Sequence, residues 1–179
     1  EYDALVSTGE DVSASLLTIA LKKLGVNARS WRGWQVPINT DSFFSNAKIK
    51  SVNTNNLIQS FKNDLEVAVI SGFQGVEDDS RITTLGRGGS DTSAVAIAAS
   101  IGSERCDIYT DVSGIYTTDP RIKRKAAKLK KISFEEMLEM ASLGANVLQT
   151  RAVEMAMRSK TPIQVLNSFS NEEGMLVCD

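Results

Sequence analysis

The stretch Thr83-Thr84-Leu85-Gly86-Arg87-Gly88-Gly89-Ser90-Asp91-Thr92-Ser93-Ala94 leads directly into an apolar run that ends at Ile101. Three of the four positions 86–89 are glycine, and glycine removes the side chain where a backbone turns sharply or approaches a ligand closely. The polar residues that follow, Ser90, Asp91 and Thr92, are typical helix caps. The stretch therefore predicts a glycine turn that opens a helix at about residues 91–101.

The same stretch has the composition of an anion site. Backbone N–H groups of the glycine turn and of the first helical turn would point at one spot, where the helix dipole also favours negative charge. Arg87 adds a planar guanidinium that matches a carboxylate or a phosphate. A turn without a ligand is the alternative, although an arginine and an aspartate inside it serve no packing purpose.

The rest of the chain alternates between helical and strand patterns. Helices are expected at about residues 9–24, 55–64 and 145–159 and from residue 133, and strands at 26–30, 48–52, 66–71, 107–110 and 163–166. Ser7 with Glu10, and Ser133 with Glu136, have the spacing of capping boxes. Such alternation predicts the α/β class, with a mainly parallel sheet covered by helices on both faces.

Length and composition indicate a soluble globular domain. At 179 residues, with 42% hydrophobic and 23% charged residues, the chain is expected to form a single domain over residues 1–179. No apolar run reaches the length of a membrane span, and a net charge of −2 gives no field that would hold nucleic acid. Neither a membrane nor a nucleic acid is therefore expected as a partner.

The scarcity of cysteine and the absence of histidine limit the chemistry. Only Cys106 and Cys178 are present, without the paired spacing of a zinc site or of a disulfide framework, so a reducing, cytoplasmic location fits. Without histidine, Ser-His-Asp and Cys-His catalysis and imidazole metal sites are excluded, and no protein metal site is expected. Carboxylates, Lys, Arg, hydroxyls and backbone groups must carry any reaction.

The glycine stretch resembles the aspartokinase branch of the amino-acid kinase family, and so does the segment Thr110–Arg121. Ser7–Glu10 and Ser133–Met137 also resemble that branch and occur in the expected order, so that the resemblance covers residues 1–179. It implies a three-layer α/β/α sandwich of the carbamate kinase-like type. It also implies transfer of the γ-phosphoryl group of ATP, with Mg²⁺, to the β-carboxylate of L-aspartate, which gives 4-phospho-L-aspartate for lysine, threonine and methionine biosynthesis.

The resemblance assigns the substrate and the transferred phosphoryl group to the first half of the chain. Arg87 and Ser90 match positions that hold aspartate, and Glu10 matches the position that contacts its amino group. Asp91 matches an acid that organises a catalytic lysine, and the paired glycines Gly88 and Gly89 line the transferred group. From its sequence pattern alone, Glu10 has a simpler alternative, namely a helix cap.

The nucleotide site is expected in the second half of the chain. The resemblance implies that Thr110 and Tyr116 lie near the base and ribose, that Asp111 belongs to the same site, and that Arg121 lies near the phosphates. Asn146 stands where the family usually has a nucleotide-contacting lysine, so ATP affinity or metal dependence is expected to differ. An Asx turn at Asp111, packing of Tyr116 and a solvated basic run around Arg121 are the alternatives.

The reaction suits a chain without histidine, because a carboxylate is already ionised at pH 7 and needs no general base. The signatures of P-loop enzymes, protein kinases and Rossmann dehydrogenases do not occur. The rivals are a glutamate or uridylate kinase of the same family and a non-catalytic module that binds nucleotide or amino acid. The central prediction is that the Arg87 turn and the Thr110–Asp111 turn open into one anion-binding cavity.

Two parts of the family pattern lie outside the 179 residues. A lysine-bearing loop is expected before Glu1, and the small regulatory ACT domains are expected after Asp179, so the chain by itself is expected to be poorly active. The sequence does not give the oligomeric state, and a homo-oligomer is expected from the resemblance.

Overall fold

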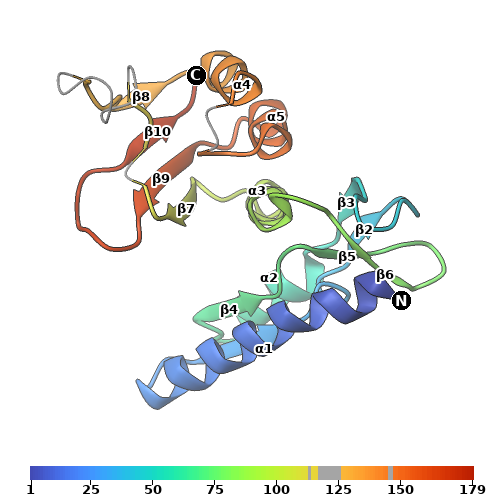
Figure 1. Ribbon diagram of the computed structural model, residues 1–179. Helices are drawn as coiled ribbons and strands as arrows, with labels where there is room; N and C mark the ends of the chain where they lie inside the picture. Colours follow the sequence, from blue (N-terminus) through green and yellow to red (C-terminus); the bar gives the residue numbers. More distant parts are fainter. Residues whose placement is uncertain (113, 117–125, 145–146) are drawn as a thin grey trace. The chain divides into compact units, whose positions relative to one another are not determined.

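The computed structural model describes residues 1–112, 114–116, 126–144 and 147–179 (Figure 1). The chain divides into two compact units, Glu1–Ile101 and Gly102–Asp179. The expectation of a single domain over residues 1–179 stays a prediction.

The first unit combines three helices with two sheets (Figure 1). Its helices are α1 (Tyr2–Lys23), α2 (Asn55–Lys62) and α3 (Gly89–Ile101). Its strands are β1 (Ala28–Trp31), β2 (Ile38–Thr40), β3 (Ile49–Val52), β4 (Val67–Ile70), β5 (Gln74–Val76) and β6 (Ile82–Thr84). β1 and β4 pair in parallel, and the other four strands form a sheet in the order β3-β2-β5-β6, in which only the β2–β5 pair is parallel.

The second unit has one four-stranded sheet in the order β7-β9-β10-β8. Its elements are β7 (Cys106–Thr110), β8 (Lys131–Ile132), α4 (Phe134–Ser142), α5 (Thr150–Ser159), β9 (Ile163–Asn167) and β10 (Met175–Val177). β7 pairs with β9 and β8 with β10 in parallel, whereas β9 and β10 are antiparallel.

The α/β class is confirmed, and the sheets contain parallel strand pairs as expected. The antiparallel pairs come from short connections that sequence patterns did not predict. β5 and β6, for example, flank a turn in which the Ser80 N–H donates to the Glu77 carbonyl, and this turn brings Val76 opposite Ile82. Such a hairpin can only be antiparallel, because a parallel pair needs a crossover of a dozen or more residues.

Helix α1 differs most from its sequence prediction, because it begins at Tyr2 rather than near Gly9. The predicted capping box is wrong: the Ser7 hydroxyl donates to the Ala4 carbonyl, as serines inside helices often do. The second predicted capping box is confirmed, because the Ser133 Oγ accepts from the Glu136 N–H while the Glu136 carboxylate accepts from the Ser133 N–H.

Each unit has its own set of buried core residues. In the first unit Trp31, Val36 and Leu57 form a cluster, against which half-buried side chains such as Ile70 and Ile97 pack. In the second unit the buried residues include Phe134, Met137, Val153, Ile163, Val165 and Met175. Contrary to the expectation from the sequence, helix α1 is by length and composition apolar enough to cross a membrane. Its inner face nevertheless carries buried polar residues, Asp3, Ser7 and Thr18, which suit a helix packed on protein rather than lipid.

Candidate functional site

The glycine turn forms as the sequence indicates. The Gly89 N–H donates to the Gly86 carbonyl at 3.0 Å, and Gly86 and Gly88 have φ angles of +74° and +68°. Side chains are disfavoured at such angles, so this turn needs glycine. Arg87 lies at the exposed tip between the two, and no hydrogen bond or ion pair holds its side chain within the described residues.

The turn continues into α3 without a side-chain cap. α3 begins at Gly89, so Ser90, Asp91 and Thr92 lie inside its first turn, and the prediction that they cap the helix is wrong. The Thr92 hydroxyl donates back to the Gly88 carbonyl at 3.0 Å. The Gly86–Gly89 hydrogen bond starts the helix instead of a side chain.

A cavity of about 350 Å³ lies beside this helix start. Its polar and small lining residues are Glu10 from α1, Gly72 after β4, and Ser90 and Ser93 from α3. Its apolar lining comes from Ala68, Ile70, Ala94 and Ile97. The structure therefore brings together two of the predicted substrate residues, Glu10 and Ser90, although they are eighty positions apart in the chain.

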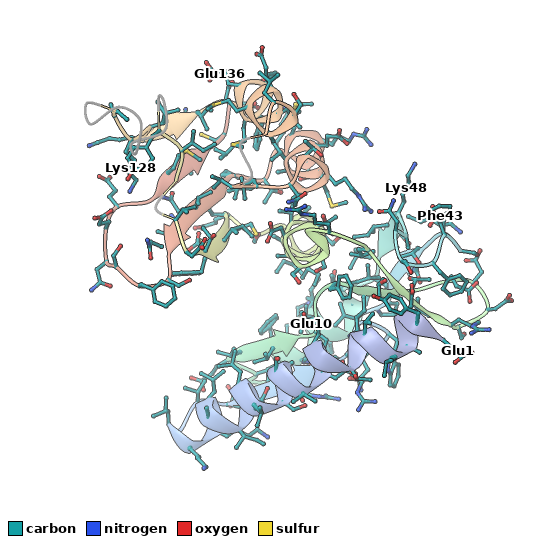
Figure 2. The ribbon with its side chains drawn as sticks, viewed as in Figure 1. Glu1, Glu10, Phe43, Lys48, Lys128 and Glu136 are labelled. Carbon is teal, nitrogen blue, oxygen red and sulfur yellow. The ribbon has the colours of Figure 1, made fainter. Side chains whose placement is uncertain are left out.

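Glu10 reaches this cavity from the third turn of α1 (Figure 2). Because the helix begins at Tyr2, the alternative that Glu10 merely caps a helix is wrong. Its side chain is half-buried and has no hydrogen-bond or ion-pair partner within the described residues. A carboxylate held in this way is suited to receive a cationic group.

Asp91 lies half-buried in the first turn of α3. Burial raises the pKa of its carboxyl group above the ordinary value. No cation or hydrogen-bond donor offsets this burial in the part of the chain that the structure describes, so the carboxylate is suited to receive a positive group. This environment is compatible with the role that the family resemblance implies for Asp91.

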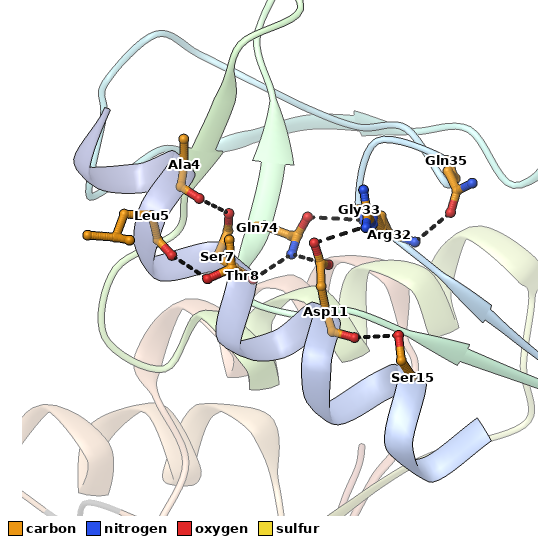
Figure 3. A network of polar contacts seen from close by, with 10 residues as sticks. All are labelled: Ala4, Leu5, Ser7, Thr8, Asp11, Ser15, Arg32, Gly33, Gln35 and Gln74. Atoms are coloured by element: carbon orange, nitrogen blue, oxygen red, sulfur yellow. Dashed lines mark hydrogen bonds and ion pairs between the residues drawn. The ribbon is translucent and has the colours of Figure 1, made fainter. Parts of the chain in front are cut away.

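A buried glutamine ties the helix that carries Glu10 to the rest of the unit (Figure 3). The Gln74 amide donates to the Ser7 carbonyl and to the Asp11 carboxylate, and it accepts from the Gly33 N–H. Arg32 completes the network with an ion pair to Asp11 at 3.4 Å. Sequence reasoning missed Gln74, because nothing in the local pattern distinguishes a buried amide from an exposed one.

A second buried polar residue, Asp3, holds the strand that leads into the glycine turn. Its carboxylate accepts from the Thr84 N–H at 2.7 Å and from the N–H and the hydroxyl of Ser45 at 2.8 and 2.9 Å. Burial alone would raise the pKa of Asp3, but these hydrogen bonds outweigh it and lower that pKa below its ordinary value. Asp3 therefore joins the start of α1 to the end of β6.

The predicted nucleotide residues belong to the second unit. Thr110 ends β7, and its hydroxyl donates to the Asp111 carboxylate at 3.2 Å. Tyr116 is half-buried and pairs with Lys128 in an isolated antiparallel bridge. Arg121 and Asn146 lie outside the described residues. The prediction of one cavity for the Arg87 and Thr110–Asp111 turns involves both units and stays a prediction.

The described residues contain no cluster of three or more acidic or cysteine side chains that would hold a metal ion by themselves. Mg²⁺ is commonly held by one or two carboxylates together with substrate phosphates and water. A site of that second kind needs few protein carboxylates, because the nucleotide supplies most of the ligands.

The sequence matches the model of the amino acid kinase family over residues 1–167, which is nearly the whole chain. The chain belongs to the amino acid kinase family. This membership agrees with the α/β class and with the sequence resemblance.

Curated relatives within the family are aspartokinases. The chain is 50% identical over 177 residues to an aspartokinase of Bacillus sp. (strain MGA3), and 52% identical over 180 residues to an aspartate kinase of Pseudomonas fluorescens (strain SBW25). Each match covers 99% of this chain and 43% of the relative. The chain thus spans about two-fifths of the length of these relatives.

The chain is also similar to solved structures of aspartokinases. The structure of E. coli aspartokinase III in complex with aspartate and ADP superposes with a TM-score of 0.89 at 37% identity, covering 99% of this chain and 40% of that one. Aspartate kinase from Synechocystis gives 0.85 at 43% identity, covering 99% and 29%. UMP kinase from Ureaplasma parvum, at 16% identity and 0.68 over 99% of this chain and 71% of that one, shares the fold alone.

Proposed function

We propose that this family member is an aspartokinase, which transfers the γ-phosphoryl group of ATP to the β-carboxylate of L-aspartate to form 4-phospho-L-aspartate. The observation that carries the proposal is the cavity shared by Glu10 and Ser90 at the start of α3. It combines an acid for an ammonium group with a hydroxyl and a helix start for a carboxylate, which are the two ends of an amino acid. Aspartokinase relatives and solved aspartokinase structures support the choice of substrate.

The chemistry asks the protein to hold two repelling anions in line and to neutralise the transferred charge. In the proposed arrangement Glu10 binds the ammonium group of aspartate, and Arg87 and Ser90 hold its carboxylates. Asp91 orients a catalytic lysine, and Gly88 and Gly89 let the phosphoryl group approach the backbone. The β-carboxylate attacks without a general base, since it is ionised at neutral pH.

ATP and Mg²⁺ are proposed as the phosphoryl donor and its metal ion. Thr110, Asp111, Tyr116, Arg121 and Asn146 are proposed as the nucleotide site. Bound Mg²⁺ would shield the charge of the phosphates, with the phosphates and water as its main ligands. Lysine and threonine biosynthesis and a cytoplasmic location are proposed along with the activity.

The activity is tested in the full-length protein with aspartate, glutamate and UMP supplied in parallel. Hydroxamate trapping detects the acyl phosphate formed from aspartate or glutamate, and ADP release detects phosphorylation of UMP, whose product is a diphosphate. Phosphorylated product is expected in the reaction with aspartate and not in the reactions with glutamate or UMP. Product with glutamate or UMP would identify the related kinases, and ATP binding without any product would identify a non-catalytic module. Arg87→Ala is expected to abolish aspartate-dependent turnover, and unchanged kinetics would remove Arg87 from the site.

A homo-oligomer is proposed on the evidence of the outer face of α1. Leu5, Val12, Leu16 and Ile19 lie at heptad-like spacing along it and are 53–70% exposed. Among them lies Gly9, around which no atom approaches the position of a Cβ within 4 Å. An apolar stripe with a small residue in it suits close packing against the same helix of a second copy.

Light scattering after size-exclusion chromatography tests this proposal. The Leu16→Glu variant is expected to lower the mass of the particle by dissociating it, while Lys22→Glu, on the same helix, leaves the mass unchanged. A monomeric unsubstituted protein would contradict the proposal, and so would binding to lipid vesicles through α1.

A further inference from the structure

Ser93 makes an interaction that no predicted role covers. Its hydroxyl accepts a hydrogen bond from the Phe73 N–H at 3.1 Å and donates one to the Ser90 carbonyl at 2.9 Å. The residue is 1% exposed and lines the cavity that Glu10 and Ser90 share. One oxygen atom thus connects the segment after β4 to the first turn of α3.

The segment that Ser93 holds has an unfavourable backbone conformation. Phe73 has a φ of +66°, an angle that residues other than glycine rarely adopt. Its N–H bonds to Ser93, and its carbonyl accepts from the Leu85 N–H at 2.9 Å, just before the glycine turn. The strain therefore persists because hydrogen bonds on both sides of Phe73 fix the segment.

The backbone at Gly72 lies so close to Ser93 and Ser90 that it has little room to move. A Cβ placed on Gly72 would lie 3.0 Å from the Ser93 Oγ and 3.4 Å from the Ser90 Cα. The backbone at Gly72 thus packs directly on the first turn of α3, and both line the same cavity. The width of the cavity at this point depends on the Ser93 hydroxyl, since that atom sets the distance between the two walls.

We infer that Ser93 is a positioning residue for the amino-acid substrate: its hydroxyl fixes Ser90 relative to Gly72 and so sets the shape of the substrate cavity. Ser93 acts through its neighbours and takes no part in the phosphoryl transfer. This inference rests on the proposed function for its kinetic consequence, whereas the contact itself is independent of the activity.

The test compares three variants of the full-length protein. Ser93→Ala removes the acceptor of the Phe73 N–H, so that aspartate must restore the positions of Gly72 and Ser90 when it binds, and a cost the size of one hydrogen bond raises the KM for aspartate about ten-fold. The KM for ATP is expected to change by less than about two-fold, because the described residues that line the cavity all belong to the unit Glu1–Ile101, whereas the nucleotide residues are predicted in the other unit. Ser93→Thr keeps the hydroxyl and restores the KM for aspartate.

Ser100→Ala is the matched control, because the Ser100 hydroxyl donates to a carbonyl four residues earlier in the same helix, at 2.8 Å, and does not line the cavity. It is expected to leave both KM values unchanged. Hydrogen exchange of the Phe73 amide, measured without substrates, is expected to be faster in Ser93→Ala than in the unsubstituted protein or in Ser100→Ala.

The outcomes separate the inference from the proposed function. Equal rises in both KM values in Ser93→Ala would overturn the positioning role, and so would unchanged Phe73 exchange with an unchanged KM for aspartate. If the unsubstituted protein shows no aspartate-dependent turnover, the proposed function fails. In that case the role of Ser93 is decided by hydrogen exchange of the Phe73 amide and by calorimetric measurement of aspartate binding. An unchanged affinity for aspartate in Ser93→Ala would refute the positioning role.

Discussion

Replacing Asp3 tests how the start of α1 holds the strand that leads into the glycine turn. The carboxylate of this 2% exposed residue accepts three hydrogen bonds, two from Ser45 and one from the Thr84 N–H. In Asp3→Ala the Thr84 N–H stays buried without an acceptor, which costs about 1–3 kcal/mol. The exposed Ser45 groups can turn to water, so their loss adds about 0.5–1.5 kcal/mol.

The expected loss for Asp3→Ala is therefore about 1.5–4.5 kcal/mol in the free energy of unfolding. Asp3→Asn is the matched control, because its amide oxygen can still accept from the two backbone N–H groups. It loses the charge but keeps the shape, and an effect of about 1 kcal/mol is expected, since hydrogen bonds to charged groups are stronger than neutral ones.

Urea denaturation of the two variants and the unsubstituted protein at pH 7 measures these differences, with equal m-values as the check on a two-state comparison. The pKa of Asp3 is lowered by folding from an ordinary value of 3.8, so its contribution is complete above that value and disappears as the pH falls through the lower, folded value. The difference in free energy of unfolding between Asp3→Ala and the unsubstituted protein should therefore become smaller as the pH is lowered. A gap below about 0.5 kcal/mol at pH 7 would refute the reasoning, because such a value is ordinary for an exposed position.

Two further predictions concern the turn and the nucleotide. Gly88→Ala should lower the free energy of unfolding by about 1–2 kcal/mol, because Gly88 has a φ of +68°, which favours glycine. Urea denaturation measures this loss, and an unchanged free energy of unfolding would contradict the need for glycine at this position. Asn146→Lys should tighten ATP binding in calorimetry, because lysine adds a charge for the phosphates, and an unchanged affinity would count against a nucleotide contact at residue 146.

The sequence predicted best what depends on local chemistry. Gly86 and Gly88 form the expected turn, because a positive φ is a property of the residue itself. The capping box at Ser133 formed as well. The same spacing at Ser7 did not, because apolar and helix-forming residues extend α1 back to Tyr2 and place the serine inside it. A short pattern cannot show on which side of it a helix begins.

The sequence could not predict what depends on tertiary contact. Asp3 and Gln74 contact partners about 40 to 80 residues away, and their burial follows from the packing of α1 rather than from their neighbours in the chain. The cavity shared by Glu10 and Ser90 was anticipated only through the family resemblance. The short strands β5 and β6 have three residues each, too few for a periodic pattern.

The two tryptophans of the chain, Trp31 and Trp34, both belong to the unit Glu1–Ile101, where the first is buried in the core cluster and the second is 48% exposed. Fluorescence excited selectively at tryptophan therefore reports on that unit, whereas the far-ultraviolet circular dichroism signal contains helices from both units. Melting curves from the two spectroscopic signals coincide only if both units unfold together. Comparing the two melting curves of one purified sample therefore tests whether the two units unfold cooperatively.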